Sequence, residues 1–198
     1  MPAAGESELR AIVLGTPWLL RALESVRGLG LEAACIGAGA LRDAVWDALH
    51  GNAEGRLPRD VDVAHFDLGD LSRDADERLE RALRESEPTL PWEVTNQAGV
   101  HLWFERRFGH PVRAFTCLEE AVASWPETAT AVAVSLDGAG ELQVLAPLGL
   151  ADLLGMVLRR NPARVSPEEY RRRLATKHDA RRWPRVEIVS DGLAAWPA

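Results

Sequence analysis

The sequence predicts an α/β (α+β) fold, in which a β-sheet is flanked by helices and followed by a C-terminal helical segment. Three observations lead to this prediction. Short apolar runs bounded by glycine or proline, typical of strands, alternate with capped helical patterns. The hairpin signal Asp137-Gly138-Ala139-Gly140 separates two of these runs. From Leu148 onward the apolar spacing becomes helical.

The first half of the chain reads as two helices, a strand and a third helix. Residues 7–14 and 17–26 form a helical pair, with Thr16-Pro17 supplying the cap and first turn of the second helix. Residues 31–36 are a short apolar run, which predicts the first strand. Apolar residues at helical spacing over 41–49 predict the next helix.

The middle of the chain reads as two strands around one helix. Residues 59–63 are expected to form a strand, because Asp60 and Asp62 alternate with Val61 and Val63. Residues 74–87 form a charged amphipathic helix that Pro88 ends. The next strand is expected over 91–95.

The last part of the chain predicts a hairpin between helices. A helix over 116–124 precedes two strands over 131–136 and 142–146. An apolar stripe then predicts one helix through Leu158, and Ser166-Pro167 begins another. Residues 186–189 are either a final strand or an ordered tail.

The glycine-rich turn Gly37-Ala38-Gly39-Ala40 is a candidate phosphate site. It lies between a predicted strand and the start of a helix. Free backbone N–H groups and the positive end of the helix dipole favour a phosphate there, and glycine allows close approach. We expect Gly37, Ala38 and Gly39 to contact phosphate, with Arg42 as a charged donor.

Asp60 and Asp62 are a candidate metal pair. Successive strand side chains point to opposite faces, so these two carboxylates project together while Val61 and Val63 enter a core. Adjacent carboxylates repel each other unless a cation neutralises them. The pair therefore predicts a divalent metal that bridges to the phosphates.

A dinucleotide-binding site is the main alternative, because it also combines a glycine-rich turn with an acidic residue about 20 positions later. Its third glycine or alanine should occupy position 42, which is Arg42 here. The acidic residues also begin the apolar strand instead of ending it. Both details disfavour this alternative.

The chain resembles the nucleotidyltransferase-like proteins of bacteria, a branch of the DNA-polymerase-beta-type nucleotidyltransferase superfamily. The resemblance covers most of the sequence. It is carried by matching segments over 37–43, 45–46, 59–63, 92–97, 101–103, 125–131, 146–153 and 160–162. The superfamily pattern expects Gly followed by Gly or Ser, whereas Gly37 is followed by Ala38 and only then by Gly39.

The resemblance implies a mixed-sheet nucleotidyltransferase core that moves a nucleoside monophosphate from NTP and releases pyrophosphate. It further implies two Mg²⁺ ions, or Mn²⁺ in their place, held by three carboxylates. Asp60 and Asp62 match the metal pair. The third carboxylate is expected to be Glu93, on the next strand, with Asp137 as a weaker candidate.

Length and charge set further expectations. With 198 residues, the chain is expected to be one nucleotidyltransferase-like domain, with a core over about 30–146 and a C-terminal helical extension over about 147–198. No apolar run approaches the ~20 residues that span a bilayer, and no signal peptide is recognisable, so we expect a cytoplasmic protein with no membrane partner. The net charge of −7 argues against broad nucleic-acid binding.

Arginines cluster late in the sequence. They either cover a solvated helix face or clamp a triphosphate or polyanionic acceptor. The clustered residues are Arg159, Arg160, Arg164, Arg171, Arg172, Arg173, Arg181 and Arg182.

Two functions follow from these expectations. The first is a metal-dependent nucleotidyltransferase with an NTP donor and an unidentified acceptor hydroxyl or phosphate. The second is a non-catalytic nucleotide-binding regulatory or interaction module on the same fold, which a missing third carboxylate would favour. The sequence specifies neither the acceptor, the base of the NTP nor the oligomeric state.

Overall fold

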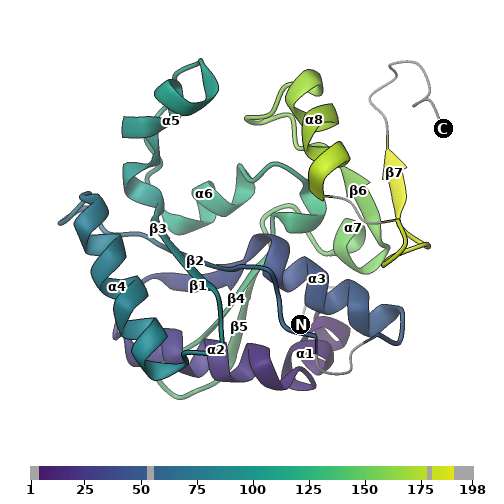
Figure 1. The fold of residues 1–198 in the computed structure, drawn as a ribbon, viewed down its shortest axis with the longest axis horizontal. Helices are drawn as coiled ribbons and strands as arrows, with labels where there is room; N and C mark the ends of the chain where they lie inside the picture. Colours follow the sequence, from purple (N-terminus) through teal and green to yellow (C-terminus); the bar gives the residue numbers. More distant parts are fainter. Residues whose placement is uncertain (1–4, 53–55, 178–179, 190–198) are drawn as a thin grey trace.

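A computed structural model describes residues 5–52, 56–177 and 180–189. Its centre is a five-stranded sheet with the strand order β3-β2-β1-β4-β5 (Figure 1). The strands are β1 (Ala34–Gly37), β2 (Val61–His65), β3 (Trp92–Asn96), β4 (Ala133–Leu136) and β5 (Leu142–Leu145).

The sheet is mixed, as expected. β1 is antiparallel to both β2 and β4, and β4 and β5 form the expected hairpin. β2 and β3 are parallel, and their crossover is helix α4 (Arg73–Ser86). The antiparallel pairing of β1 with β2 also excludes the dinucleotide-binding alternative, which requires a parallel βαβ unit.

The two faces of the sheet differ. One face packs against α1 (Glu6–Leu14), α2 (Pro17–Gly28), α3 (Ala38–Leu49) and α4, and it forms the main hydrophobic core. On the other face, Cys35, Ala64 and Ala133 form a small cluster with Val122 of α6 (Leu118–Ala123). The rest of this second face is not covered by the main core, which leaves room for a site.

The chain between β3 and the hairpin is largely helical. The 3₁₀ turn Gln97–Gly99 leads directly from β3 into α5 (Val100–Phe108), and a second 3₁₀ turn covers Thr128–Thr130. α5 stands above the sheet, opposite α8 (Pro167–Lys177), in Figure 1. These two helices flank the uncovered part of the second face.

The C-terminal segment is less helical than expected. α7 is a single turn (Ala151–Leu154), and Val157 and Leu158 lie in β6 (Val157–Arg159), which pairs in parallel with β7 (Glu187–Val189). The prediction of one helix through Leu158 was therefore wrong. Met156 has a positive φ of 55°, which ends the helix, and the partner strand β7 was not visible from local spacing.

Two further expectations concern the last residues of the chain and membrane-spanning helices. Of the two alternatives for residues 186–189, a strand or an ordered tail, the structure shows a strand, β7, while residues 190–198 of the expected C-terminal extension lie outside the described ranges. Across the ranges that the structure covers, no helix has both the length and the apolar character that a bilayer span requires.

Gly37 ends β1 at a point of close packing. A Cβ atom at this position would lie 2.6 Å from Cζ3 of Trp125 and 2.7 Å from the carbonyl oxygen of Val132. The carbonyl belongs to the backbone and cannot move aside as a flexible side chain can. Position 37 therefore has no room for a side chain.

We predict that Gly37→Ala lowers the free energy of unfolding by about 1–3 kcal/mol, because the added methyl overpacks this junction. Urea titration of the variant measures the change. Gly28→Ala is the control, since no atom lies within 4 Å of its added Cβ. It should be neutral or slightly stabilising. Equal stability of the two variants would contradict the packing role of Gly37.

Candidate active site

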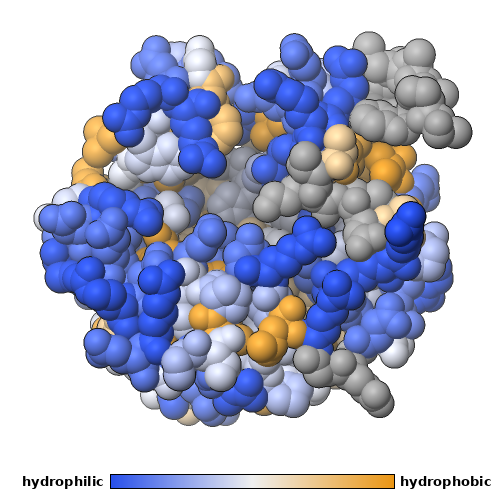
Figure 2. All heavy atoms as spheres, viewed as in Figure 1, coloured by the Kyte–Doolittle hydropathy of each residue, from blue (hydrophilic) through white to orange (hydrophobic). Residues whose placement is uncertain are grey.

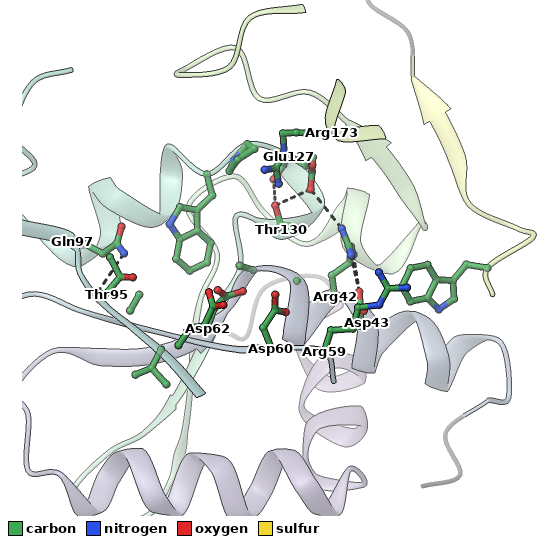
Figure 3. Close-up of a pocket in the computed structure, with 18 of the residues that line it drawn as sticks. Arg42, Asp43, Arg59, Asp60, Asp62, Thr95, Gln97, Glu127, Thr130 and Arg173 are labelled. Atoms are coloured by element: carbon green, nitrogen blue, oxygen red, sulfur yellow. Dashed lines mark hydrogen bonds and ion pairs between the residues drawn. The ribbon is translucent and has the colours of Figure 1, made fainter. Parts of the chain in front are cut away.

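Asp60 and Asp62 face the same point beside α3, as Figure 3 shows. A Cβ atom built on Gly39 would lie 4.0 Å from Asp60 Oδ1 and 4.0 Å from Asp62 Oδ2. The glycine leaves this space open. The two carboxylates and the start of α3 therefore converge on one small volume.

The position of the two carboxylates follows from alternation along β2. Val61 and Val63 are almost fully buried in the main core, so the intervening Asp62 points to the second face. Asp60 directly precedes the strand, which begins at Val61 and not at residue 59 as expected. The predicted convergence of the two carboxylates nevertheless holds, because both side chains face Gly39.

The start of α3 supplies the other wall. Ala38 and Gly39 line the cavity, whereas Gly37 is not among its lining residues. The absent side chain of Gly37 serves packing against Trp125 instead of the predicted contact with phosphate. Ala38 has a φ of 51°, a conformation that costs a residue with a side chain about 1 kcal/mol. The strained residue sits where the helix presents its free N–H groups.

Glu93 lies beside Asp62. The parallel register of β2 and β3 pairs these two residues, so their side chains share the second face. Both line the same cavity. The chosen third carboxylate is thus adjacent to the pair, although no three His, Cys, Asp or Glu side chains of the described residues already form a group that could hold a metal ion.

Asp137 has a different role. It accepts hydrogen bonds from the backbone N–H groups of Glu141 (2.9 Å) and Ala139 (2.9 Å) and from the Gln143 side chain (2.8 Å). These hydrogen bonds, from Glu141 above all, lower the pKa of the carboxyl group. Asp137 shapes the hairpin turn between β4 and β5 and does not line the cavity, so it is the poorer candidate.

Arg42 is already held by carboxylates. Its Nε and Nη2 atoms donate to Asp43 Oδ1 at 3.1 and 2.7 Å, and Nη1 lies 3.5 Å from Glu127 Oε2. The side chain is buried, with its guanidinium over the rings of Trp46 and Trp183. Arg42 lines the cavity, but its partners make it a structural group and not the open phosphate donor that we expected.

Arg42 belongs to a larger ion network that joins the C-terminal segment to the site (Figure 3). Arg173 of α8 donates to Glu127 Oε1 at 3.1 Å. Arg182 contacts Asp43 at 3.1 Å and Asp47 at 2.9 Å. Burial raises the pKa of the Asp43 carboxyl despite the guanidinium groups around it.

The sequence alone did not indicate Glu127 as a site residue. It is only 2% exposed and follows the Trp125-Pro126 segment. Asn161 holds that segment by donating to the carbonyl oxygens of Ala123 (2.7 Å) and Trp125 (2.9 Å). The only signal in the sequence was the matching segment over 125–131, in which nothing distinguished the glutamate.

The cavity itself has a volume of about 310 Å³. The strands β2 and β3, the start of α3, the Pro126–Glu127 link and the C-terminal segment all contribute to its wall. Two acidic oxygen donors face a helix N-terminus, a combination suited to a hard divalent cation and phosphate together. The residues present therefore fit the divalent metal that the sequence implied.

Comparison with known proteins identifies the fold and the family of the chain. A protein solved by NMR and described as revealing a CCA-adding enzyme head domain has a similar fold, with a TM-score of 0.78. The two chains are 26% identical, and the match covers 93% of this chain and 96% of that chain. No curated protein matches the sequence. The family model described as Nucleotidyltransferase matches residues 24–188, and the chain accordingly belongs to that nucleotidyltransferase family.

Proposed function

We propose that this protein is a metal-dependent nucleotidyltransferase that moves a nucleoside monophosphate from an NTP to an acceptor hydroxyl or phosphate and releases pyrophosphate. The observation that carries the proposal is the convergence of Asp60 and Asp62 on Gly39 at the start of α3. Family membership supports an NTP as the donor.

In this proposal, different residues around the cavity bind the phosphates and the metal. The backbone N–H groups of Ala38 and Gly39 bind the donor phosphates. Asp60 and Asp62 hold the metal, and Glu93 completes the set from the acceptor side. When bound there, Mg²⁺ or Mn²⁺ neutralises charge on the phosphates and favours ionisation of the acceptor hydroxyl.

Arg59 is a better candidate than Arg42 for a charged contact with phosphate. Both line the cavity. Arg42 is committed to Asp43 and Glu127, whereas Arg59 makes no side-chain ion pair with any residue that the structure describes. An arginine without a carboxylate partner beside a phosphate site can bind the phosphate oxygens directly.

A non-catalytic nucleotide-binding module is the second candidate function. It is favoured by the absence, among the described residues, of three carboxylates already grouped to hold a metal. In that case Asp60 and Asp62 bind nucleotide and metal without Glu93, and no transfer follows. Variants of Glu93 separate the two functions.

We predict that Asp60→Asn and Asp62→Asn each abolish metal-dependent NTP binding and nucleotidyl transfer. The fold should survive, because asparagine has nearly the same volume as aspartate and both side chains face the cavity and not the main core. Isothermal titration with each of the four NTPs, with and without Mg²⁺, measures binding. Asp74→Asn is the matched control, since this exposed residue of α4 does not line the cavity. Wild-type turnover in either site variant would refute the assignment.

Glu93→Gln should leave NTP affinity within about threefold of wild type while reducing transfer by at least about a hundredfold, because the lost charge serves the acceptor side. The readout is single-turnover release of pyrophosphate once an acceptor is known. If the wild-type protein binds NTP but transfers to no acceptor, and Glu93→Gln changes nothing, the non-catalytic function gains support.

Substitution of Arg59 should affect NTP binding, whereas substitution of Arg42 should affect the stability of the fold. Arg59→Gln is expected to weaken NTP binding about tenfold with an unchanged melting temperature, because a charge-assisted hydrogen bond is lost. Arg42→Gln is expected to lower the free energy of unfolding by about 3–5 kcal/mol, because it leaves buried carboxylates unpaired. Thermal unfolding and titration of both variants test this. If Arg42→Gln instead weakens NTP binding and leaves stability unchanged, Arg42 and not Arg59 contacts the phosphate.

A further inference from the structure

A second cavity, of about 680 Å³, opens beside the carboxylate cavity. Its walls come from α5, the 124–126 segment and the start of α8. Figure 2 shows the surface hollowed between these two helices, with apolar side chains in its wall. The two cavities share Thr95, Gln97, Trp125, Pro126 and Arg173, so they are adjacent.

Aromatic rings line this second cavity. Phe104 lies with its ring centroid 4.5 Å from that of Phe108 and 6.2 Å from that of Trp103. Trp125 adds a fourth ring at the border with the first cavity. Phe108 is 44% exposed, so part of its side chain remains accessible to a ligand. Such a wall favours a planar ring, which can stack on it.

Arginine supplies nearly all the charge in the same wall. Among its described lining residues, Glu169 is the only carboxylate, and it already accepts a hydrogen bond from the Ser166 backbone at 2.8 Å. The arginines are Arg107, Arg164, Arg172 and Arg173, of which Arg173 already pairs with Glu127. Arg107 and Arg164 make no ion pair with any described residue, so in a chain with a net charge of −7 these two arginines favour an anionic ligand.

Arg164 brings positive charge into contact with the aromatic rings of the wall. Its guanidinium lies 4.9 Å from the ring centroid of Phe104 and 4.0 Å from that of Phe115. Burial lowers the pKa of Arg164 to about 10, so it still carries its charge at neutral pH. The arginine is held against the rings, where it can contact an anion attached to a stacked ring.

The position of the second cavity favours an acceptor over the NTP donor as its ligand. Thr95 lies two residues after Glu93 on β3, and it lines both cavities. A molecule in the second cavity therefore reaches the carboxylates from the β3 side. The phosphate-binding start of α3 forms a different part of the wall and does not line the second cavity.

We propose that the second cavity binds the acceptor, and that the acceptor is a nucleotide whose base stacks on the α5 rings and whose phosphate contacts the arginines. This inference rests on the proposed nucleotidyl transfer. An acceptor hydroxyl oxygen forms the new bond to the α-phosphorus of the NTP, the bond to pyrophosphate breaks, and the hydroxyl proton passes to solvent. The same chemistry is offered by a free mononucleotide and by the terminal nucleotide of an oligonucleotide.

Titration with simple nucleotides tests the proposal. The full chain with Mg²⁺ is saturated with the α,β-methylene analogue of the NTP that it binds best. It is then titrated with AMP, CMP, GMP, UMP and the dinucleotide ApA. At least one probe should bind beside the analogue. Tighter binding of ApA than of AMP assigns the site to a chain end, and the opposite order assigns it to a free nucleotide.

Variants of α5 locate the binding. Arg107→Gln and Phe108→Ala should each weaken the probe about tenfold and leave the analogue unaffected, because each removes one contact from the wall. Arg106→Gln and Leu102→Ala are matched controls, since both residues are exposed on the same helix and line neither cavity. The proposal is overturned if no probe binds, if the analogue displaces the probe, or if the variants and controls behave alike.

The experiment distinguishes failure of the proposed nucleotidyl transfer from failure of the proposed nucleotide site in the second cavity. If no NTP analogue binds, the probes are titrated alone. A probe that is weakened by Arg107→Gln and Phe108→Ala but not by Asp60→Asn or Asp62→Asn preserves the nucleotide site while the transfer reaction is rejected. A probe lost in the Asp variants instead rejects the second cavity as its site.

Discussion

The alternation of side chains along β2 is the constraint on which the site depends. β2 lies between β1 and β3, and its Val61 and Val63 are sealed in the core against the helices. A shift of register by one residue would drive Asp62 into that core, at a cost of several kcal/mol. Burial of the valines therefore holds the carboxylates toward the cavity, and the parallel partner β3 adds Glu93 beside them.

Closure of the site depends on charges carried by a distant part of the chain. Arg173 and Arg182 pair with Glu127, Asp43 and Asp47, and this network binds the C-terminal segment to α3. Buried ion pairs of this kind contribute little net stability, but breaking one leaves an uncompensated charge. Such a network holds the arginines beside the start of α3 and limits the ways in which the C-terminal segment can dock.

Two cavities of different chemistry meet at Thr95, Gln97 and Trp125. Carboxylates and a helix N-terminus distinguish the first cavity, and a group of aromatic rings distinguishes the second, while arginines line both. Trp125 also fills the space beside Gly37, so the border between the cavities is packed directly onto the end of β1.

Local sequence patterns predicted the five strands of the central sheet, most helices, the convergence of Asp60 and Asp62, and the glycine turn at the start of α3, because caps, alternation and turn residues act over a few neighbouring positions. What lies across the cavity depends on tertiary contacts. It converted the expected helix near Leu158 into β6, turned Arg42 into a structural ion pair, and brought Glu127 and Arg173 together with that arginine. These outcomes depend on strand partners and buried charges that are far apart along the chain, and local spacing carries no information about such contacts.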